Sequence, residues 1–316
     1  RFLTKKISFF PKDSFKSPMG RSFFSRIAVI FLLGFPTHGV SAQEILTIGS
    51  VSGTPKEEVE KFQPFIDYLA SHLKGFGIHA GRVIVKTTVH EMADEIIKGE
   101  VDLYLDSPFS VVRIAKVTGA KPFLRRWKKG VSDYSGVFFV RKDSGIERLS
   151  DLKGKMIAFK NSHSTSGYLL PKATLLKERL KLSAKTERKT VLPDEVGYIF
   201  AFSEENVIFW VLRKKVACGI VDNESFVKKS HASIKDIKIL EETIKVPRHV
   251  MLHRGDLDPK LVQAITEILT PMHEDAEGKR TLEKFERTTK FDLFPNGADK
   301  DLEPVKDLAE RIEQEI

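Results

Sequence analysis

The chain has 316 residues, of which 41% are apolar and 30% are charged, and it contains a single cysteine. This composition excludes a disulfide scaffold, a collagen-like repeat and a wholly disordered chain, and the length suffices to bury one large core or two smaller ones. The formal charge is +9, but residues 1–42 carry seven Lys or Arg and one Asp, so the rest of the chain is only +3 and charge alone does not indicate nucleic-acid binding.

The N-terminal region is typical of an exported protein. Arginines precede an apolar run at residues 27–35 that is too short to span a bilayer, and small residues ending at Ala42 follow. We expect a secretory signal peptide cleaved after Ala42, with Met19 as the start and residues 1–18 as an upstream over-extension of the reading frame. A buried N-terminal helix is the less favoured alternative. No Cys follows the cleavage site to carry a lipid anchor, and the signal peptide leads us to expect a periplasmic protein.

Alternating strands and helices are predicted for the first part of the exported chain. Short apolar runs predict strands at residues 45–51, 82–88 and 101–105, and helical spacing of apolar residues predicts helices at 59–73 and 92–97. Strand, helix and strand at this spacing imply parallel pairing in a sheet that is covered on both faces.

The later part of the chain repeats this pattern. We predict strands at 137–140, 156–159 and 218–221, with helices at 169–180, 207–211, 261–272 and 302–312. Extended segments at 135–141 and 245–252 would run side by side as a two-strand hinge. We therefore expect an α/β fold of two lobes, each a mixed, mainly parallel sheet flanked by helices, made of residues 43–136 with 248–316 and of residues 137–247. A cleft between the lobes would collect strand ends and helix N-termini.

A cluster of hydroxyl residues lies between a predicted strand and a predicted helix. Ser164, Thr165 and Ser166 precede Gly167 in this turn. The first amides of a helix have no intrahelical partner and the helix dipole favours an anion, so this turn could hold a tetrahedral oxyanion. Ordinary capping of the helix by one Ser or Thr is the alternative that the spacing leaves open.

The same turn carries a family resemblance. Its sequence resembles the Ser-Thr-Ser-Gly-aromatic-Leu-x-Pro segment of the phosphonate-binding (PhnD-like) periplasmic solute-binding proteins of ABC importers, here Ser164-Thr165-Ser166-Gly167-Tyr168-Leu169-Leu170-Pro171. The resemblance extends in order through Ile48-Gly49-Ser50, Gly99-Glu100-Val101-Asp102, Val140-Arg141-Lys142-Asp143-Ser144, Asp151-Leu152-Lys153-Gly154-Lys155 and Val221-Asp222-Asn223. It implies the two-lobed type II periplasmic binding protein fold, a phosphonate, phosphite, phosphate or related oxyanion as ligand, and a membrane permease as partner.

The resemblance also implies roles for single residues. Ser164, Thr165 and Ser166 would hold ligand oxygens with hydroxyls and backbone amides, and Asp222 would line the same cleft.

Three further residues are candidates by position. We expect Ser107 in the cleft, on the side of the first lobe. Ser52 and Thr54, on the turn after the first strand, would offer a second helix N-terminus that faces the cleft, with a plain turn as an equally favoured alternative.

Two positions depart from the family pattern. Asp106 stands where well-known family members have a Tyr at the end of the third strand, and Glu204 stands where they have a cleft His. An unpaired carboxylate repels a phosphonate dianion. The ligand could carry a cation that pairs with these acids, the acids could be protonated donors, or they could point elsewhere. We favour the first explanation, which predicts a small zwitterion or an oxyanion with an amine, because protonating exposed carboxylates takes large pKa shifts.

The remaining candidates have structural interpretations. Cys218, in a short apolar run, is predicted to be a small core residue rather than a reactive thiol. His249 and His253 share one face of an extended segment, but no third ligand is spaced nearby, so a metal site is not expected. The basic stretch at 125–129 is interpreted as a solvated strand or a docking edge rather than a nucleic-acid patch.

We expect a non-enzymatic binding protein, since the sequence contains no cofactor motif and no catalytic constellation. Its expected partners are a small oxyanion or zwitterion and an ABC permease in the inner membrane, with no cofactor, metal or nucleic acid. A periplasmic sensory subunit that docks on a membrane receptor or sensor kinase is the alternative. An enzyme on the same fold would need Cys218 to be exposed in the cleft.

Overall fold

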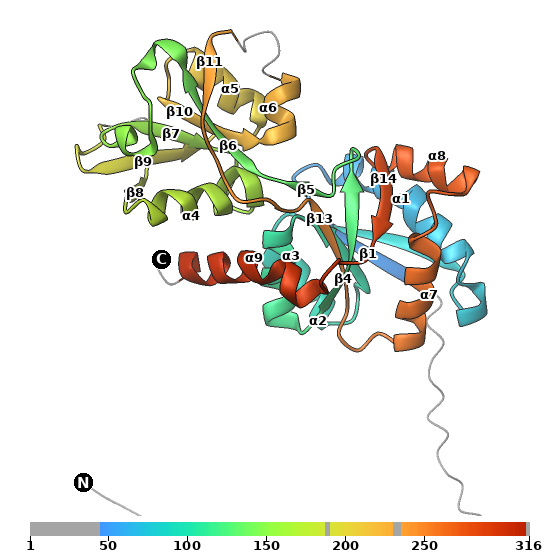
Figure 1. Ribbon diagram of the computed structural model, residues 1–316. Helices are drawn as coiled ribbons and strands as arrows, with labels where there is room; N and C mark the ends of the chain where they lie inside the picture. Colours follow the sequence, from blue (N-terminus) through green and yellow to red (C-terminus); the bar gives the residue numbers. More distant parts are fainter. Residues whose placement is uncertain (1–44, 187–189, 230–234, 314–316) are drawn as a thin grey trace, which may run out of the picture. The chain divides into compact units, whose positions relative to one another are not determined.

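The computed structural model describes residues 45–186, 190–229 and 235–313 (Figure 1). The expected signal peptide, with Met19 and Ala42, lies outside these residues. No helix within the described ranges has the length and apolar character needed to cross a membrane.

The first sheet combines strands from the beginning and the end of the described chain. Its order is β14-β4-β13-β3-β1-β2, formed by β1 (Ile45–Val51), β2 (Ala80–Lys86), β3 (Leu103–Asp106), β4 (Lys121–Lys128), β13 (His249–His253) and β14 (Thr288–Asp292). β1 is parallel to β2 and β3, whereas β13 is antiparallel to β3 and β4, and β14 is antiparallel to β4. The predicted parallel pairing at the start of the fold is confirmed.

Helices α1 (Pro55–Ser71), α2 (Val89–Ile97), α3 (Pro108–Thr118), α7 (Pro259–Leu269), α8 (Ala276–Lys284) and α9 (Ala298–Glu313) accompany the first sheet. Apolar side chains of α1 at helical spacing, among them Phe62, Phe65 and Leu69, are buried in one cluster with Phe285 and Phe291. This burial fixes the loop between α8 and β14 against α1, and the loop carries part of the site described below.

The second sheet has the order β11-β6-β10-β7-β9-β8. It is formed by β6 (Gly136–Arg141), β7 (Met156–Phe159), β8 (Lys181–Ala184), β9 (Glu195–Phe200), β10 (Cys218–Asp222) and β11 (Ile237–Glu242), with helices α4 (Leu170–Lys177), α5 (Glu204–Leu212) and α6 (Asn223–Lys229). β7, β8, β9 and β10 run parallel, and β6 is antiparallel to its neighbours β10 and β11. The expected architecture of two mixed, mainly parallel sheets flanked by helices is confirmed.

Two short strands lie where the chain passes between the sheets. β5 (Asp133–Tyr134) pairs antiparallel with β12 (Val246–Pro247). The chain leaves the first sheet after β4 and returns to it at β13 (Figure 1). The lobe boundaries expected from the sequence, residues 43–136 with 248–316 and residues 137–247, stay a proposal.

Helix α9 contacts helices that accompany each of the two sheets. It packs on α3 and on α4, and its buried residues Leu302, Val305 and Ile312 belong to the same apolar cluster as Tyr134 and Leu170. One apolar cluster therefore joins residues from both halves of the described chain.

Two local predictions are corrected by the structure. The basic stretch at 125–129 does fall on a strand, but β4 lies between β14 and β13 and the side chain of Arg126 is completely buried, so the stretch is neither a solvated strand nor an edge. The helix expected from residue 169 is preceded by one π-helical turn, Thr165–Leu169, and α4 begins only at Leu170. Cys218 is fully buried, which confirms its assignment to the core.

Candidate functional site

A polar cavity of about 360 Å³ lies where strands of both sheets end. From the first sheet it is lined by the ends of β1, β3 and β4, and from the second by residues that follow β7 and β9 and by the end of β10. Its charged lining comprises the cations Arg126, Lys128, Lys129, Lys160 and Arg248 and the carboxylates Glu58, Asp106, Glu204, Asp222 and Glu286. Ligand sites of open α/β sheets lie at the carboxyl ends of the strands, so this cavity is the candidate site.

The hydroxyl turn, Ser164–Ser166, reaches this cavity with two of its three side chains. Ser164 and Ser166 line the cavity, and Ser164 Oγ accepts a hydrogen bond from the Gly167 amide at 3.0 Å. The amides of Thr165 and Ser166 donate to no described residue. These amides are the unpaired donors expected at the start of a helix, and two hydroxyls stand beside them.

Thr165 points away from the cavity. Its side chain is fully buried, and its Oγ1 accepts a hydrogen bond at 2.9 Å from the amide of Phe109 in α3. The side chains of Thr165 and Ser166 lie near the Tyr134 phenol. Burial raises the pKa of Tyr134 to about 12, so the phenol is neutral at physiological pH. The role of Thr165 as a ligand residue stays a prediction.

Glu204 forms an ion pair with a lysine of the cavity lining. It is the first residue of α5, after the N-cap Ser203, and its Oε1 lies 2.6 Å from Lys160 Nζ, just beyond β7. Both side chains line the cavity. Among the explanations considered for the two acids, Glu204 therefore needs neither a ligand cation nor a bound proton.

Asp106 differs from Glu204 because it makes no ion pair with any described residue. Its Oδ2 accepts from the hydroxyl of Tyr104 at 2.6 Å and its Oδ1 accepts from the Ser107 amide at 2.5 Å. Burial and the neighbouring Asp106 charge raise the pKa of Tyr104, which keeps that phenol a donor. Asp106 and Ser107 both line the cavity.

Asp222 lies at the end of β10 and also lines the cavity. Its Oδ1 accepts from the Ser225 amide at 3.0 Å and lies 3.5 Å from a nitrogen of Arg248. Arg248 also lies 3.6 Å from Glu224 Oε2, and its guanidinium covers the Tyr134 ring at 4.7 Å. The segment between β12 and β13 is thereby tied to the second sheet.

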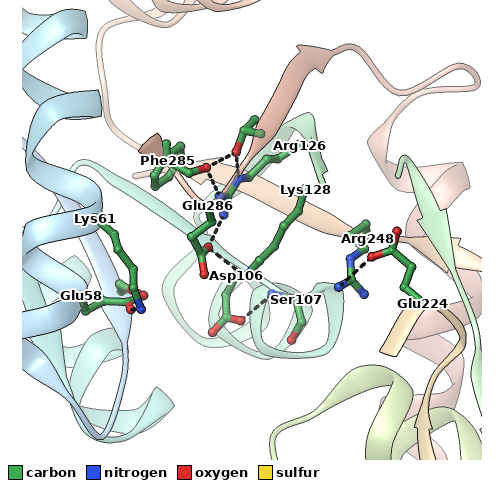
Figure 2. A network of polar contacts seen from close by, with 12 residues as sticks. Glu58, Lys61, Asp106, Ser107, Arg126, Lys128, Glu224, Arg248, Phe285 and Glu286 are labelled. Carbon is green, nitrogen blue, oxygen red and sulfur yellow. Dashed lines mark hydrogen bonds and ion pairs between the residues drawn. The ribbon is translucent and has the colours of Figure 1, made fainter. Parts of the chain in front are cut away.

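A buried ion cluster on the first sheet was not expected from the sequence. Figure 2 shows the carboxylate of Glu286 between the guanidinium of Arg126 and the ammonium of Lys128, at 3.1 Å and 2.8 Å. Arg126 also donates to Thr288 Oγ1 and to the carbonyl of Phe285, both at 2.8 Å, and it stacks on the Phe285 ring.

The pKa values of Lys128 and Glu286 in this cluster lie below their ordinary values. Burial lowers the pKa of Lys128 to about 8, although Glu286 opposes the shift. Burial alone would raise the pKa of Glu286, but the charges of Lys128 and Arg126 outweigh it and lower the pKa to about 2. Glu286 is therefore ionised over the physiological range.

Lys129 and His249 complete the basic side of the cavity. Lys129 follows β4 and its ammonium makes no ion pair with any described residue, and His249 begins β13 beside Arg126 of β4. Burial lowers the pKa of His249 well below its usual value, and the charges of Lys128, Arg126, Arg248 and Lys160 add to this effect. Four cations acting on one neutral imidazole indicate a positive local potential.

Ser52 and Thr54 lie outside the cavity lining. Thr54 is exposed and Ser52 is half-buried, the Thr54 amide donates to Ser52 Oγ at 3.2 Å, and the two hydroxyl oxygens are 3.3 Å apart. Their contact with a ligand stays a prediction, and Thr54, the N-cap of α1, makes no side-chain capping bond.

The sequence did not predict that basic residues line the cavity. The one available signal was the two-residue spacing of Arg126 and Lys128, which places both on one face of a strand. The described residues contain no group of three or more His, Cys, Asp and Glu side chains arranged to hold a metal ion.

Comparison with known proteins decides the family. The family model of the "ABC transporter, phosphonate, periplasmic substrate-binding protein" matches residues 49–295. The chain belongs to this family. Its members are substrate-binding components of ABC transporters rather than enzymes, and the type II periplasmic binding protein fold implied by the sequence is confirmed.

Solved structures of similar proteins agree with this assignment. XAC2383 from Xanthomonas citri bound to ATP is 27% identical, with a TM-score of 0.80 over 86% of this chain and 98% of that chain. PhnD1 from Prochlorococcus marinus in complex with methylphosphonate is 16% identical, with a TM-score of 0.63 over 85% of this chain and 98% of that chain. A binding protein component of an ABC phosphonate transporter from Pseudomonas aeruginosa is 17% identical, with a TM-score of 0.61 over 86% of this chain and 87% of that chain. The last two show the fold alone.

Proposed function

We propose that this protein is the substrate-binding component of an ABC importer, acts in the periplasm, and binds a small solute through an anionic oxygen group in the cavity. One observation carries the proposal. Ser164 and Ser166 line the cavity at a turn where the amides of Thr165 and Ser166 have no acceptor among the described residues. Free amides at a helix start, with hydroxyls beside them, suit a phosphate-like group.

Similarity to XAC2383 supports a phosphate-like ligand. That protein is 27% identical and its structure is described as bound to ATP, which carries phosphate groups. For this chain we propose only that the ligand carries a phosphate-like group.

Asp106 supports an amine on the same solute. Of the two acids that depart from the family pattern, Glu204 is neutralised by Lys160. Asp106 lines the cavity, and among the described residues it accepts hydrogen bonds but makes no ion pair. A ligand cation beside Asp106 would offset the repulsion between this carboxylate and the anionic group.

Ligand binding would change how the two sheets are arranged relative to each other. The cavity lining comes from both sheets, so a ligand that touches both sides favours the arrangement in which they enclose it. This is a population shift toward the form that a permease can recognise.

Ligand screening tests the proposal. Native mass spectrometry of freshly purified protein should reveal a retained small anion. A thermal-shift panel of phosphate, phosphite, methylphosphonate, 2-aminoethylphosphonate and ATP should contain a stabilising compound, which at a hundred times its dissociation constant adds about 2.7 kcal/mol. Ser166→Asp, which puts a carboxylate beside the free amides, should abolish the shift, whereas Ser150→Asp at an exposed position should keep it. The proposal fails if no compound binds, or if Ser166→Asp binds as tightly as the wild type.

Location and partner require separate measurements. Cell fractionation should place the protein in the periplasm, and crosslinking in the presence of ligand should capture an ABC permease. Capture of a receptor or sensor kinase instead would overturn the importer role while leaving the ligand proposal intact.

A further inference from the structure

The charges that line the cavity cancel almost completely in pairs. Lys160 is paired with Glu204, Arg248 with Asp222 and Glu224, Arg126 and Lys128 with Glu286, and Glu58 with Lys61. Within the described residues, the lining charges left without an ion pair are the carboxylate of Asp106 and the ammonium of Lys129.

Lys129 is held at the cavity by its backbone. Its amide donates to the carbonyl of Arg287 at 2.8 Å, and its φ of 58° is in the left-handed region, which is uncommon for a residue with a side chain. Burial lowers the pKa of Lys129, with Arg248 adding to this effect and Asp222 and Glu204 opposing it. The lysine side chain is thus partly desolvated beside groups of the second sheet and the inter-sheet segment.

Two further nitrogen groups lie at the same edge of the first sheet. Because β13 runs antiparallel to β4, with His249 opposite Arg126, the start of β13 lies beside the end of β4. Arg248 is only 6% exposed and lines the cavity, and its Nε has no hydrogen-bond partner among the described residues. His249 Nδ1 is also buried, and no partner for it lies in the part of the chain that the structure describes. A buried guanidinium N–H normally has an acceptor, and Arg248 Nε has none among the described residues.

We propose that Lys129, Arg248 and His249 form a second anion subsite, and that the natural solute therefore carries two anionic groups. This inference rests on the proposed function, in which the hydroxyl turn holds the first group. The guanidinium Nε–H, the lysine ammonium and a neutral imidazole N–H are all donors to carboxylate or phosphate oxygens. The solute is thus a phosphonate or phosphate that bears a further carboxylate or phosphate.

A matched pair of ligands tests this inference. Phosphonoacetate and ethylphosphonate share the phosphonate and have similar size, but only phosphonoacetate has a carboxylate at the other end. Isothermal titration calorimetry should show that phosphonoacetate binds the wild type at least tenfold more tightly. The ratio of the two dissociation constants should fall toward one in Lys129→Met and be retained in Lys129→Arg. Lys279→Met, at an exposed position in α8, should keep the wild-type ratio.

The outcomes separate the two proposals. If both ligands bind the wild type with equal affinity and Ser166→Asp abolishes binding, the second subsite is wrong and the proposed function stands. A preference for phosphonoacetate that persists in Lys129→Met also overturns the subsite. If neither ligand binds at all, and the wider panel fails as well, the proposed function falls together with this inference.

Discussion

The hydroxyl oxygen of Thr165 accepts a hydrogen bond from the amide of Phe109 at 2.9 Å. Phe109 lies in the first turn of α3, whose N-cap Ser107 makes no side-chain capping bond. Thr165, which follows strand β7 of the second sheet, therefore provides the acceptor for an amide in the first turn of α3, a helix beside the first sheet. One side of the hydroxyl turn thus joins the two halves, while Ser164 and Ser166 face the cavity.

Removal of the Thr165 acceptor should destabilise the fold. Thr165→Val keeps the shape of the side chain but leaves the buried Phe109 amide unsatisfied, which should lower the free energy of unfolding by about 1–3 kcal/mol. Urea denaturation measures this loss. Thr289→Val is the control, because the Thr289 hydroxyl is exposed and makes only a 3.4 Å contact, so its effect should stay within about 0.5 kcal/mol. Equal stability of the two variants would contradict the structural role of Thr165.

The two acids that replace family donors should respond differently to neutralisation. Asp106→Asn should remove the preference for 2-aminoethylphosphonate over ethylphosphonate, because the unpaired carboxylate is the proposed partner of the amine. Glu204→Gln should instead tighten binding of both ligands by about tenfold, since it releases the ammonium of Lys160 from its 2.6 Å ion pair. Calorimetric titration of each folded variant measures both effects. If every affinity is unchanged, neither acid acts on the ligand.

Glu286 should stabilise the protein in a pH-dependent way. Its pKa in the folded state is about 2, below the ordinary value of 4.5, so its contribution is fully present above pH 4.5 and is lost as the pH falls toward 2. The difference corresponds to about 3 kcal/mol at neutral pH. Glu286→Gln should therefore be destabilised at pH 7, and the gap to the wild type should narrow below pH 4.5. Glu283→Gln, exposed on the preceding helix, should follow the wild type at each pH.

The sequence predicted the strands that are continuous apolar runs. β7 has the predicted bounds, Met156–Phe159, and β10 begins at the predicted Cys218. Strands covered on both faces consist of such runs, so the signal is local. The hydroxyl turn was found for a similar reason, because all of its residues are consecutive.

The basic part of the site could not be predicted in this way. Arg126 is fully buried because Glu286 and Thr288 accept from it, and these partners lie about 160 residues further along the chain. The pairing of Lys160 with Glu204 likewise joins residues 44 positions apart. A basic segment without visible partners resembles a solvated one, and only tertiary structure shows that its charges are neutralised.

Cys218 should be unreactive in the native protein. Its side chain is fully buried in β10, and burial raises the pKa of the thiol. N-ethylmaleimide should therefore modify no cysteine in the folded protein and one per chain after denaturation, since the sequence contains a single Cys. Mass spectrometry counts the modification. Rapid labelling of the native protein would show an accessible thiol and would revive the enzyme alternative.

Gly136 allows the hydroxyl turn to approach β6. A Cβ at this position would overlap the carbonyl oxygen of Ser166, which is backbone and cannot rotate away. Gly136→Ala should therefore displace the turn, lower the free energy of unfolding by about 1–3 kcal/mol and weaken ligand binding at least tenfold. Thermal unfolding and calorimetric titration of the same preparation measure the two effects.

Gly75→Ala is the matched control for this prediction. A Cβ at Gly75 meets no atom within 4 Å, and the residue does not have a left-handed backbone. This variant should bind the ligand like the wild type, with unchanged or slightly higher stability, because alanine restricts the unfolded chain. Gly136→Ala with wild-type affinity would show that the position of the Ser164–Ser166 turn does not determine binding. The site would then have to be sought on the basic side of the cavity alone.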